Sequence, residues 1–325
     1  MAERVAVVGG GVIGCAVAER LARDGHQVTL FERDAVGAHA SGAAAGLLGP
    51  HSESVDQGPD FADLGARSYR LFPELAARLE RDTGIGIEYQ EMDSVRLGFD
   101  APAGAGWTAA AEVRRLEPAL SDEFQSARIF KEAQLTPPRF VRALAAAAVR
   151  SGAEIREGEL VTAVTGEGIR LGTGRFDADH VVLAAGPWSA ALAAVDVEPR
   201  RGQLVALLPR SPVLTRIVTW DRYYLVPKPE GTVVIGSTEE QEAGFDARPT
   251  AAGISEVLQV ALRTVPALAG ASVQRVWAGI RPATPEGLPI VRRSESTPNL
   301  VLATGHHRNG ILLAPITAEI VSSLI

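Results

Sequence analysis

The sequence predicts an α/β protein of about two domains, and three observations favour this fold class. An apolar run at residues 5–8 breaks into a glycine-rich turn at residues 9–14. Valine and isoleucine runs are separated by alanine-rich helical stretches, and from residue 200 long alternating segments favour an antiparallel sheet. With 325 residues, the chain is also too long for one ordinary core.

The glycines of the first turn follow the pattern Gly-x-Gly-x-x-Gly, at Gly9, Gly11 and Gly14. The apolar residues 5–8 before them predict a strand, and residues 15–24 after them predict an amphipathic helix. Gly9 permits a tight turn, Gly11 lets the backbone approach a pyrophosphate, and Gly14 lets the helix pack close to the strand. This order of elements predicts a dinucleotide-binding turn.

The start of that helix and the next strand add two binding groups. Backbone N–H groups at the helix N-terminus, near Val12 and Ile13, can bind the anionic pyrophosphate. A second predicted strand, residues 28–31, ends on Glu32, which lies eighteen residues past Gly14. A carboxylate near this spacing meets the ribose hydroxyls of an adenosine.

Small residues dominate the segment from Ala38 to Pro50. Small side chains let the backbone lie close along a bulky ligand. The alternative is a flexible linker, but such linkers are usually Ser/Gly-rich and rarely run straight into apolar residues such as Leu47 and Leu48. A further apolar segment, residues 181–186, ends on small residues and can join the same sheet as the first strand.

The middle of the chain shows both helical and strand patterns. Residues 61–82 have roughly helical apolar spacing and predict one amphipathic helix, whereas residues 88–99 alternate like a strand. A helix is predicted from Thr136 to Arg150, because prolines 137 and 138 suit its first turn. Short strands are expected over residues 154–182, followed by longer ones at residues 203–208, 217–226 and 232–237.

Five blocks of the sequence resemble the glycine oxidase and D-amino acid oxidase family of FAD enzymes, over essentially the whole chain. They are the first turn with Glu32, residues 41–48, Ala-Ala-Gly-Pro-Trp-Ser at 184–189, Tyr-Leu-Val-Pro at 224–227, and the C-terminal pair 277–282 and 305–315. The C-terminal pair discriminates best, because many unrelated oxidoreductases share the dinucleotide turn. The resemblance implies a Rossmann-like FAD-binding domain of the glutathione-reductase type and an α+β substrate domain built on an antiparallel sheet.

Both domains are then discontinuous in sequence. The FAD-binding domain is expected at residues 1–48, 136–199 and 283–325, and the substrate-binding domain at residues 49–135 and 200–282. The resemblance implies FAD contacts from these segments, made by Gly9, Gly11, Val12, Ile13, Gly14, Glu32, Arg33, Ser41, Ala43, Ala44, Ala45, Gly46, Leu47, Val161, Ala185, Gly186, Trp188, Gly279, Arg281, His307, Arg308, Asn309, Gly310, Ile311 and Leu312.

The FAD is expected to be bound without a covalent link. Relatives that oxidise sarcosine hold their flavin through a C-terminal cysteine, and the single cysteine of this chain is Cys15. Its place on the first helix suggests a small buried residue. The N-terminus of the final helix, at residues 310–312, is expected to face the pyrimidine end of the flavin, where its partial positive charge stabilises the reduced form.

Three residues match the family's substrate-binding positions. Arg281 matches the arginine that binds the substrate carboxylate through two parallel hydrogen bonds, although a surface salt bridge is its alternative. Tyr224 matches a tyrosine that adds a further bond, with core packing as the alternative, and regular alternation turns Tyr223 to the opposite face. Arg308 matches a second arginine near flavin and substrate, which could instead cap a helix or pair with an acid.

The side-chain end of the substrate pocket is expected to include Leu48, Arg222 and Glu239. Arg222 and Glu239 depart from the glycine oxidase pattern, since relatives can carry a histidine and an apolar residue there. Charged groups at a pocket wall could select charged or polar side chains. The alternative is that they pair with one another at the rim or point to solvent.

The resemblance implies FAD-dependent oxidative deamination of D-amino acids, with glycine as a candidate substrate and oxygen as the acceptor. Three alternatives stay open: a dedicated glycine oxidase of thiamine biosynthesis, a D-amino acid dehydrogenase that reduces a quinone, and a non-catalytic flavin-binding subunit. No metal is expected, because His306 and His307 lack the three or four converging ligands of a metal site.

Charge and hydrophobicity exclude other partners. A net charge of −7 without a basic cluster argues against nucleic acid. No apolar run is long enough to span a bilayer, and a first strand at Arg4 leaves no room for a signal peptide, so a cytoplasmic enzyme is expected. The sequence leaves homo-oligomer formation open.

Overall fold

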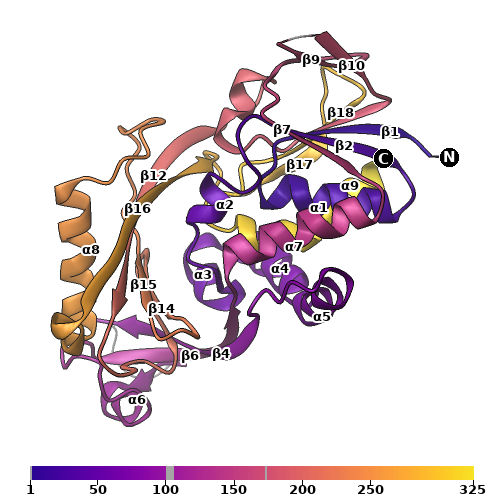
Figure 1. The fold of residues 1–325 in the computed structure, drawn as a ribbon. Coiled ribbons are helices and arrows are strands. Elements are labelled where there is room, and N and C mark those ends of the chain that lie inside the picture. Colours follow the sequence, from indigo (N-terminus) through magenta and orange to yellow (C-terminus); the bar gives the residue numbers. More distant parts are fainter. Residues whose placement is uncertain (1, 100–105, 173) are drawn as a thin grey trace.

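The computed structural model describes residues 2–99, 106–172 and 174–325 of the protein. Figure 1 shows two bodies of structure, one around the N- and C-terminal strands and one around the long strands β12 and β16. The predicted α/β class, with a largely antiparallel second sheet, is confirmed. Within these described ranges, no helix is long and apolar enough to cross a membrane.

The first sheet has six strands in the order β17-β18-β11-β1-β2-β7. All neighbours are parallel except β17 and β18, which are antiparallel. The strands are β1 (Arg4–Val8), β2 (Gln27–Glu32), β7 (Glu154–Glu157), β11 (His180–Leu183), β17 (Ile290–Arg293) and β18 (Leu300–Thr304).

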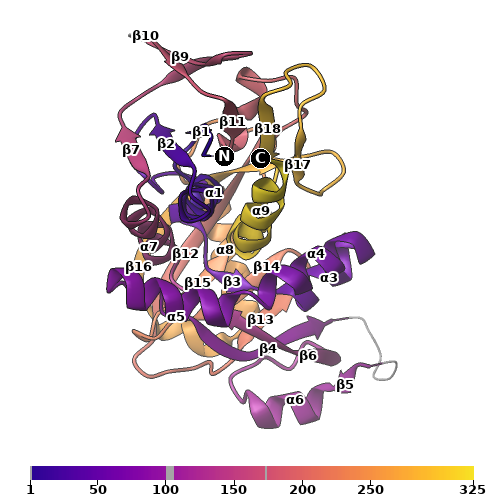
Figure 2. The same cartoon turned by 90° about the vertical axis from the view of Figure 1, so that its right-hand side faces the viewer.

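Alternating residues of β1 face two different layers. Val5 and Val7 pack against the layer of α1 (Val12–Arg23), α7 (Pro137–Arg150) and α9 (Gly310–Leu324). Figure 2 shows these three helices side by side. Ala6 and Val8 face the other layer, where a small three-stranded sheet supplies apolar side chains. That sheet consists of β8 (Val161–Thr165), β9 (Gly168–Leu171) and β10 (Gly174–Asp177), and the 3₁₀-helix η1 (Gly186–Ala191) follows β11.

The second sheet runs in the order β16-β12-β15-β14-β13-β4-β6-β3, with β5 paired to β6. Its neighbours are antiparallel except β13 and β4. α8 (Ala251–Thr264) and α6 (Ala110–Leu116) contribute apolar side chains to the core on one face, and η2 (Pro266–Gly270) follows α8. The strands are β3 (Leu47–Leu48), β4 (Gln90–Gly98), β5 (Thr108–Ala109), β6 (Ser126–Gln134), β12 (Glu198–Leu208), β13 (Ile217–Trp220), β14 (Tyr223–Pro227), β15 (Val233–Gly236) and β16 (Ser272–Ala283).

Two predicted elements are each divided in the structure. Residues 61–82 form two helices, α4 (Pro59–Tyr69) and α5 (Phe72–Thr83), because Pro73 cannot donate the hydrogen bond that would continue α4. Residues 217–226 form β13 and β14 of a tight hairpin, with Asp221 at a φ of +48° in the turn. The helix α3 (Pro50–Gln57), the strand β6 and the helix α8 have no counterpart among the predicted elements.

The predicted boundary between residues 48 and 49 differs from the packing. α4 lies against α9, and α5 lies against α7. Phe61, Phe72 and Leu79 are fully buried in the same core as Leu30 of the first sheet. The large apolar residues of α4 and α5 therefore complete the core of the first sheet and its helices, although the sequence prediction assigned residues 49–135 to the substrate domain.

Candidate active site

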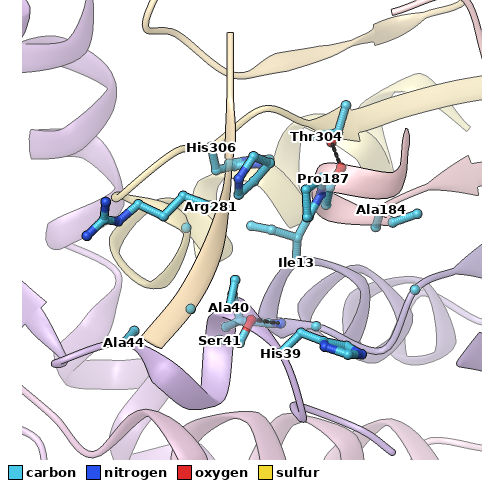
Figure 3. A pocket seen from close by; sticks show the side chains of 18 of the residues that line it. Ile13, His39, Ala40, Ser41, Ala44, Ala184, Pro187, Arg281, Thr304 and His306 are labelled. Carbon is cyan, nitrogen blue, oxygen red and sulfur yellow. Dashed lines mark hydrogen bonds between the residues drawn. The ribbon is translucent and has the colours of Figure 1, made fainter. Parts of the chain in front are cut away.

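One pocket receives residues from both large sheets and from the small-residue segment after β2. Figure 3 shows Ile13 of α1, Ser41, Ala184 and Arg281 around this cavity. Nearly all the residues predicted to contact FAD line it, apart from Gly14 and Leu312. Gly14 lies directly against the carbonyl of Gly9, and the side chain of Leu312 is buried in the core.

The glycine turn between β1 and α1 has the close contacts that its pattern predicts. Gly9 has a φ of +109°, which favours glycine. A Cβ atom on Gly14 would lie 1.9 Å from the carbonyl oxygen of Gly9, so only glycine lets α1 begin here. The Oγ of Ser41 accepts a hydrogen bond of 2.9 Å from the N–H of Val12, which ties the small-residue segment to the helix N-terminus.

The carboxylate of Glu32 is fixed at the C-terminal end of β2. Its Oε2 accepts the N–H of Gly10 at 2.7 Å, and its Oε1 accepts the N–H of Asp34 at 2.8 Å. Each carboxylate oxygen has a further lone pair, so Glu32 can still accept hydrogen bonds from ligand hydroxyls. It lines the pocket next to the glycine turn, where a ribose would be held.

Aromatic and charged side chains cluster at the outer end of the pocket. The guanidinium carbon of Arg33 lies 4.4 Å from the ring centre of Trp188, a cation–π geometry. His39 Nε2 lies 2.7 Å from Asp34 Oδ2, and Phe245 stacks on Trp188 at 5.4 Å. Ligand atoms of Glu32, Asp34 and His39 come within 4.8 Å of one another. The backbone N–H groups of Gly10 and Asp34 hold Glu32, and the contact between Asp34 and His39 holds the other two side chains, so hydrogen bonding accounts for this cluster.

The segment Ala43–Leu47 lines a narrow part of the pocket against β16. Trp277 Nε1 donates to the carbonyl of Ala43 at 2.8 Å, and a Cβ on Gly279 would lie 2.7 Å from the Cβ of Ala43. Gly46 has a φ of +84°, and a Cβ there would lie 2.0 Å from the Leu135 carbonyl oxygen. The small residues therefore bring β16 and this segment to close approach along one wall of the pocket.

Arg281 projects into the pocket from β16. Its guanidinium lies over Gly202 of β12, where a Cβ would be 2.0 Å from Nη2. Nη1 donates to the carbonyl of Thr238 at 3.2 Å, and Nη2 donates to the Oγ of Ser237. Burial lowers the pKa of Arg281, yet a guanidinium keeps its proton in proteins. The side chain is thus a fixed cation with further N–H donors.

Tyr224 and Tyr223 point to opposite faces of β14, as the alternation predicts. Tyr224 lines the pocket and lies over Gly236, where a Cβ would be 2.6 Å from the tyrosine hydroxyl. The hydroxyl of Tyr223 instead donates to Glu256 of α8 at 2.7 Å. The hydroxyl of Tyr224 and the guanidinium of Arg281 therefore belong to one pocket wall.

Arg308 also lines the pocket, and its Nε lies 3.0 Å from Oε2 of Glu53. The two side chains are 18% and 11% exposed, so this ion pair is largely shielded from solvent. Arg308 Nη2 also donates to the carbonyl of Arg222 at 3.0 Å. Glu53 was missed in the sequence because it belongs to no motif and α3 was not predicted. The proline at residue 50 was the available signal for that helix start.

The two adjacent histidines are held neutral by burial. His306 forms a 2.9 Å hydrogen bond with Thr317, and burial lowers its pKa to about 3. Burial, together with the charge of Arg281, lowers the pKa of His307 to about 4. His307 lines the pocket, and its backbone N–H donates to the carbonyl of Pro282 at 2.8 Å. Neither histidine belongs to a metal-ligand cluster among the residues that the structure describes.

The three residues expected at the side-chain end do not line the pocket. Leu48 is 0% exposed and packs in the core of the first domain. Arg222 turns to the other side of β14, where it contacts Tyr223 and Glu256 at 2.7 and 3.2 Å. Glu239 pairs with Arg200 at 2.9 Å. Both charges have ion-pair partners, which fits the alternative of paired charges at the rim, and Glu239 Oε1 also lies 3.6 Å from Nε2 of the pocket-lining His307.

The residues present fit an FAD molecule. Backbone N–H groups at the start of α1 suit a pyrophosphate, and the fixed carboxylate of Glu32 suits ribose hydroxyls. The small residues among Ala43–Leu47 let a bulky ligand lie close to the backbone. The N-terminus of α9 also borders the pocket through Gly310 and Ile311. Its partial positive charge suits the electron-rich end of a flavin.

Comparisons with known proteins agree with this geometry. Residues 4–324 match the family model described as FAD dependent oxidoreductase. The chain is 34% identical to a glycine oxidase of Geobacillus kaustophilus, covering 99% of this chain and 92% of that protein. It is 37% identical to the bifunctional protein ThiO/ThiG of Nostoc, covering all of this chain and 53% of that protein. The chain thus spans about half the length of the ThiO/ThiG relatives that it matches.

Solved structures give the same result. The crystal structure of glycine oxidase from Geobacillus kaustophilus superimposes with a TM-score of 0.92 at 33% identity, covering 99% of this chain and 94% of that one. An iminodiacetate oxidase from Chelativorans superimposes with a TM-score of 0.88 at 28% identity. The resemblance identified in the sequence is confirmed, and with it the FAD cofactor: the chain belongs to the FAD-dependent oxidoreductase family of glycine and D-amino acid oxidases.

Proposed function

We propose that the protein catalyses the FAD-dependent oxidative deamination of D-amino acids, including glycine, to 2-oxo acids, ammonia and hydrogen peroxide. The observation that carries this proposal is the convergence of Arg281 and Tyr224 on the pocket that also contains the dinucleotide turn. Relatives named glycine oxidase, 31–34% identical over at least 98% of this chain, support the same reaction class. The cytoplasmic location expected from the sequence stays a prediction.

The chain's own residues bind and orient the substrate. Arg281 donates one N–H group to Ser237 and one to Thr238. A guanidinium has five N–H donors, so others remain for a substrate carboxylate. The Tyr224 hydroxyl adds a hydrogen bond from β14, two strands further along the sheet than β12. The residues that line the pocket would hold FAD, which would supply the electron acceptor for the substrate Cα–H bond. Fixing the carboxylate orients Cα, and such positioning supplies much of the catalysis in this reaction class.

A dedicated glycine oxidase is the second candidate, because several relatives bear that name and three bear the name ThiO/ThiG. It shares the Arg281 and Tyr224 site and differs only in the range of substrate side chains.

The stereochemistry of turnover tests the proposal. A carboxylate held at Arg281 and Tyr224 leaves one orientation for Cα, so D-amino acids and glycine are expected to react and L-amino acids are not. The measurement is hydrogen peroxide release with glycine, sarcosine and matched D- and L-amino acids. Turnover of L-alanine at the rate of D-alanine would contradict the assignment. Turnover of glycine without D-alanine would favour the dedicated glycine oxidase.

Denaturation is expected to release the FAD intact. The single cysteine, Cys15, is fully buried within α1, and burial raises the pKa of its thiol above the ordinary value. A buried neutral thiol is a poor nucleophile and cannot attach to a flavin in the pocket. Acid precipitation should leave the yellow colour and the flavin fluorescence in the supernatant. Flavin that stays with the precipitated protein would overturn this prediction.

Replacing Glu239 by leucine is expected to change substrate selectivity little. The side chain is 27% exposed and does not itself line the pocket, because its carboxylate pairs with Arg200 at 2.9 Å and lies 3.6 Å from Nε2 of His307 at the pocket edge. Wild type and Glu239→Leu should therefore have similar ratios of kcat/KM for D-arginine to kcat/KM for D-leucine. The change in discrimination should correspond to less than about 1 kcal/mol. A larger loss of D-arginine preference would mean that Glu239 reaches the substrate side chain.

A further inference from the structure

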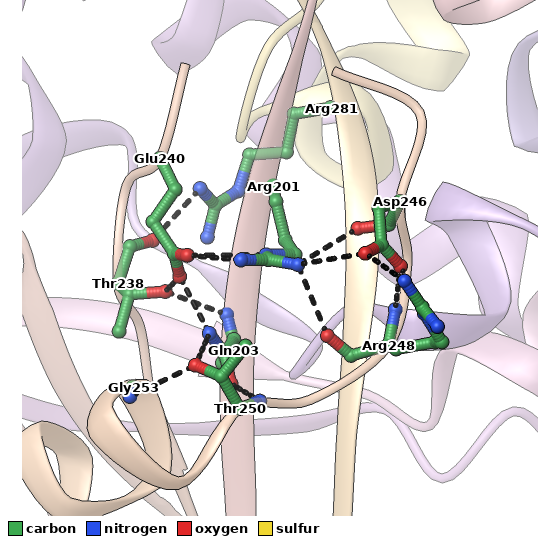
Figure 4. A network of polar contacts seen from close by, with 9 residues as sticks. All are labelled: Arg201, Gln203, Thr238, Glu240, Asp246, Arg248, Thr250, Gly253 and Arg281. Carbon is green, nitrogen blue, oxygen red and sulfur yellow. Dashed lines mark hydrogen bonds and ion pairs between the residues drawn. The ribbon is translucent and has the colours of Figure 1, made fainter. Parts of the chain in front are cut away.

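A polar network with buried and partly exposed members lies on the face of the second sheet that packs against α8. It comprises Arg201, Gln203, Thr238, Glu240 and Thr250, and we call it the Arg201–Glu240 network (Figure 4). Glu240 Oε2 accepts from Arg201 Nε at 3.1 Å and from Nη2 at 2.5 Å. Its Oε1 accepts from Gln203 Nε2 at 2.7 Å and from Thr238 Oγ1 at 2.5 Å.

The network and the pocket lie on opposite faces of β12. Gly202 faces the guanidinium of Arg281, so its neighbours Arg201 and Gln203 point the other way. Gln203 reaches Thr250 at the N-terminus of α8, with its Nε2 3.0 Å from Thr250 Oγ1. The network therefore makes no contact with substrate and can affect the reaction only through other groups.

Thr238 connects the two faces. Its side chain donates to Glu240 and accepts the N–H of Gln203 at 3.0 Å. Its carbonyl accepts Nη1 of Arg281 at 3.2 Å, and the preceding Ser237 accepts Nη2. Both groups that hold the Arg281 guanidinium thus belong to the segment that Glu240 fixes. Figure 4 shows the line of contacts from Arg281 through Thr238 to Glu240.

Backbone bonds lock the same segment to β12. The N–H of Arg201 donates to the Glu240 carbonyl at 3.0 Å, and the N–H of Glu240 donates to the Arg201 carbonyl at 2.9 Å. Arg201 is 7% exposed, and a charge buried to that extent requires a partner. Its Nη1 also donates to the carbonyls of Asp246 and Arg248, which ties down the following loop.

We infer that Glu240 and Thr238 are positioning residues that hold the Arg281 guanidinium in the geometry that binds the substrate carboxylate. This inference rests on the proposed function, because it needs Arg281 to bind a carboxylate. Loss of the Glu240 charge removes the ion pair with Arg201 and leaves the backbone bonds to hold the segment 237–240, so that Ser237 and Thr238 fix the guanidinium less firmly. We therefore expect loss of the Glu240 charge to weaken the binding of a carboxylate at Arg281 while the protein keeps its FAD.

The experiment measures acetate binding to the FAD-loaded protein through the change in the flavin absorption spectrum. Acetate has a carboxylate and no amine, so its Kd reports the carboxylate contact alone. Glu240→Gln keeps the size of the side chain and removes its charge, and Thr238→Val removes the hydroxyl and keeps the carbonyl. The matched control is Glu117→Gln, which breaks another buried ion pair of this domain, the one with Arg216 at 3.1 Å.

Glu240→Gln is expected to raise the acetate Kd and the amino acid KM about tenfold, since small displacements of a positioned group are costly. Thr238→Val should raise both several-fold, and Glu117→Gln should lower the thermal midpoint without changing either. An unchanged acetate Kd in Glu240→Gln and Thr238→Val overturns the inference, as does an equal rise in Glu117→Gln. If Glu240→Gln does not fold, Thr238→Val decides by the same readings.

Arg281→Ala separates this failure from failure of the proposed function. If Arg281→Ala leaves the acetate Kd unchanged, the proposed carboxylate site itself is wrong. If Arg281→Ala weakens acetate and the two network variants do not, only the positioning role is wrong.

Discussion

Replacing Arg281 by alanine is expected to lower kcat/KM for the best amino acid. The fall should correspond to a loss of about 2–5 kcal/mol in transition-state stabilisation, because a buried charged pair with the substrate carboxylate is lost. Both KM and kcat should change, since the same contact binds the substrate and orients its Cα. In the variant, the Oγ of Ser237 and the carbonyl of Thr238 also lose the hydrogen bonds that they accept from Arg281 in the wild type. Steady-state peroxide release over a range of substrate concentrations measures the effect.

Arg281→Lys is the matched control for charge. Lysine keeps the positive charge and cannot make two parallel hydrogen bonds to a carboxylate, so it should recover part of the binding and little of the rate. Both variants should be compared at equal FAD content, read from the flavin absorbance. Kinetics near wild type in Arg281→Ala would remove this residue from the substrate site.

Replacing Gly202 by alanine is expected to be nearly as damaging, although it leaves every charge in place. The added Cβ would lie 2.0 Å from Nη2 and 2.4 Å from Cζ of Arg281, so the guanidinium has to move. A displacement of about 1 Å at a positioning group can cost about 100-fold in rate. The expected result is therefore a loss of about two orders of magnitude in kcat/KM with normal FAD content.

Gly270→Ala is the control for Gly202→Ala. Gly270 ends η2 just before β16, and a Cβ there meets no atom within 4 Å. It should leave kcat/KM and the thermal midpoint close to wild type. If Gly202→Ala is equally silent, the guanidinium does not need its place over β12 for turnover.

Local patterns were sufficient to predict several residues that line the pocket. The spacing of Gly9, Gly11 and Gly14 specifies the turn, in which Gly14 lies against Gly9, although Gly9 also lies close to Ala184 and Gly11 to Ser41. The alternation along β14 placed Tyr224 and Tyr223 on opposite faces, because that periodicity is a property of any extended strand. Glu32 at the end of β2 follows from the same local order.

Charged residues away from such patterns depended on partners far along the chain. Glu239 and Arg222 were expected in the pocket, yet they pair with Arg200 and Glu256, 39 and 34 residues away. Glu53 reaches Arg308 from a helix that carried no recognised signal. Long charged side chains rotate freely enough to choose among several neighbours, and only the assembled fold shows which neighbour is present.

The sequence by itself determined the α/β class, the dinucleotide turn, the FAD cofactor and the position of Arg281 in a motif, because these depend on residues close in sequence or on an extended family resemblance. Only the tertiary structure decided that Leu48 belongs to a core and that Glu53 borders the pocket. It also decided that the pair of Arg201 and Glu240 lies on the face of β12 opposite the Arg281 guanidinium. These outcomes depend on which strands become neighbours. The sequence of β12 places Arg201 and Gly202 on opposite faces, but which face borders the pocket is decided only when β15, β16 and α8 pack around β12.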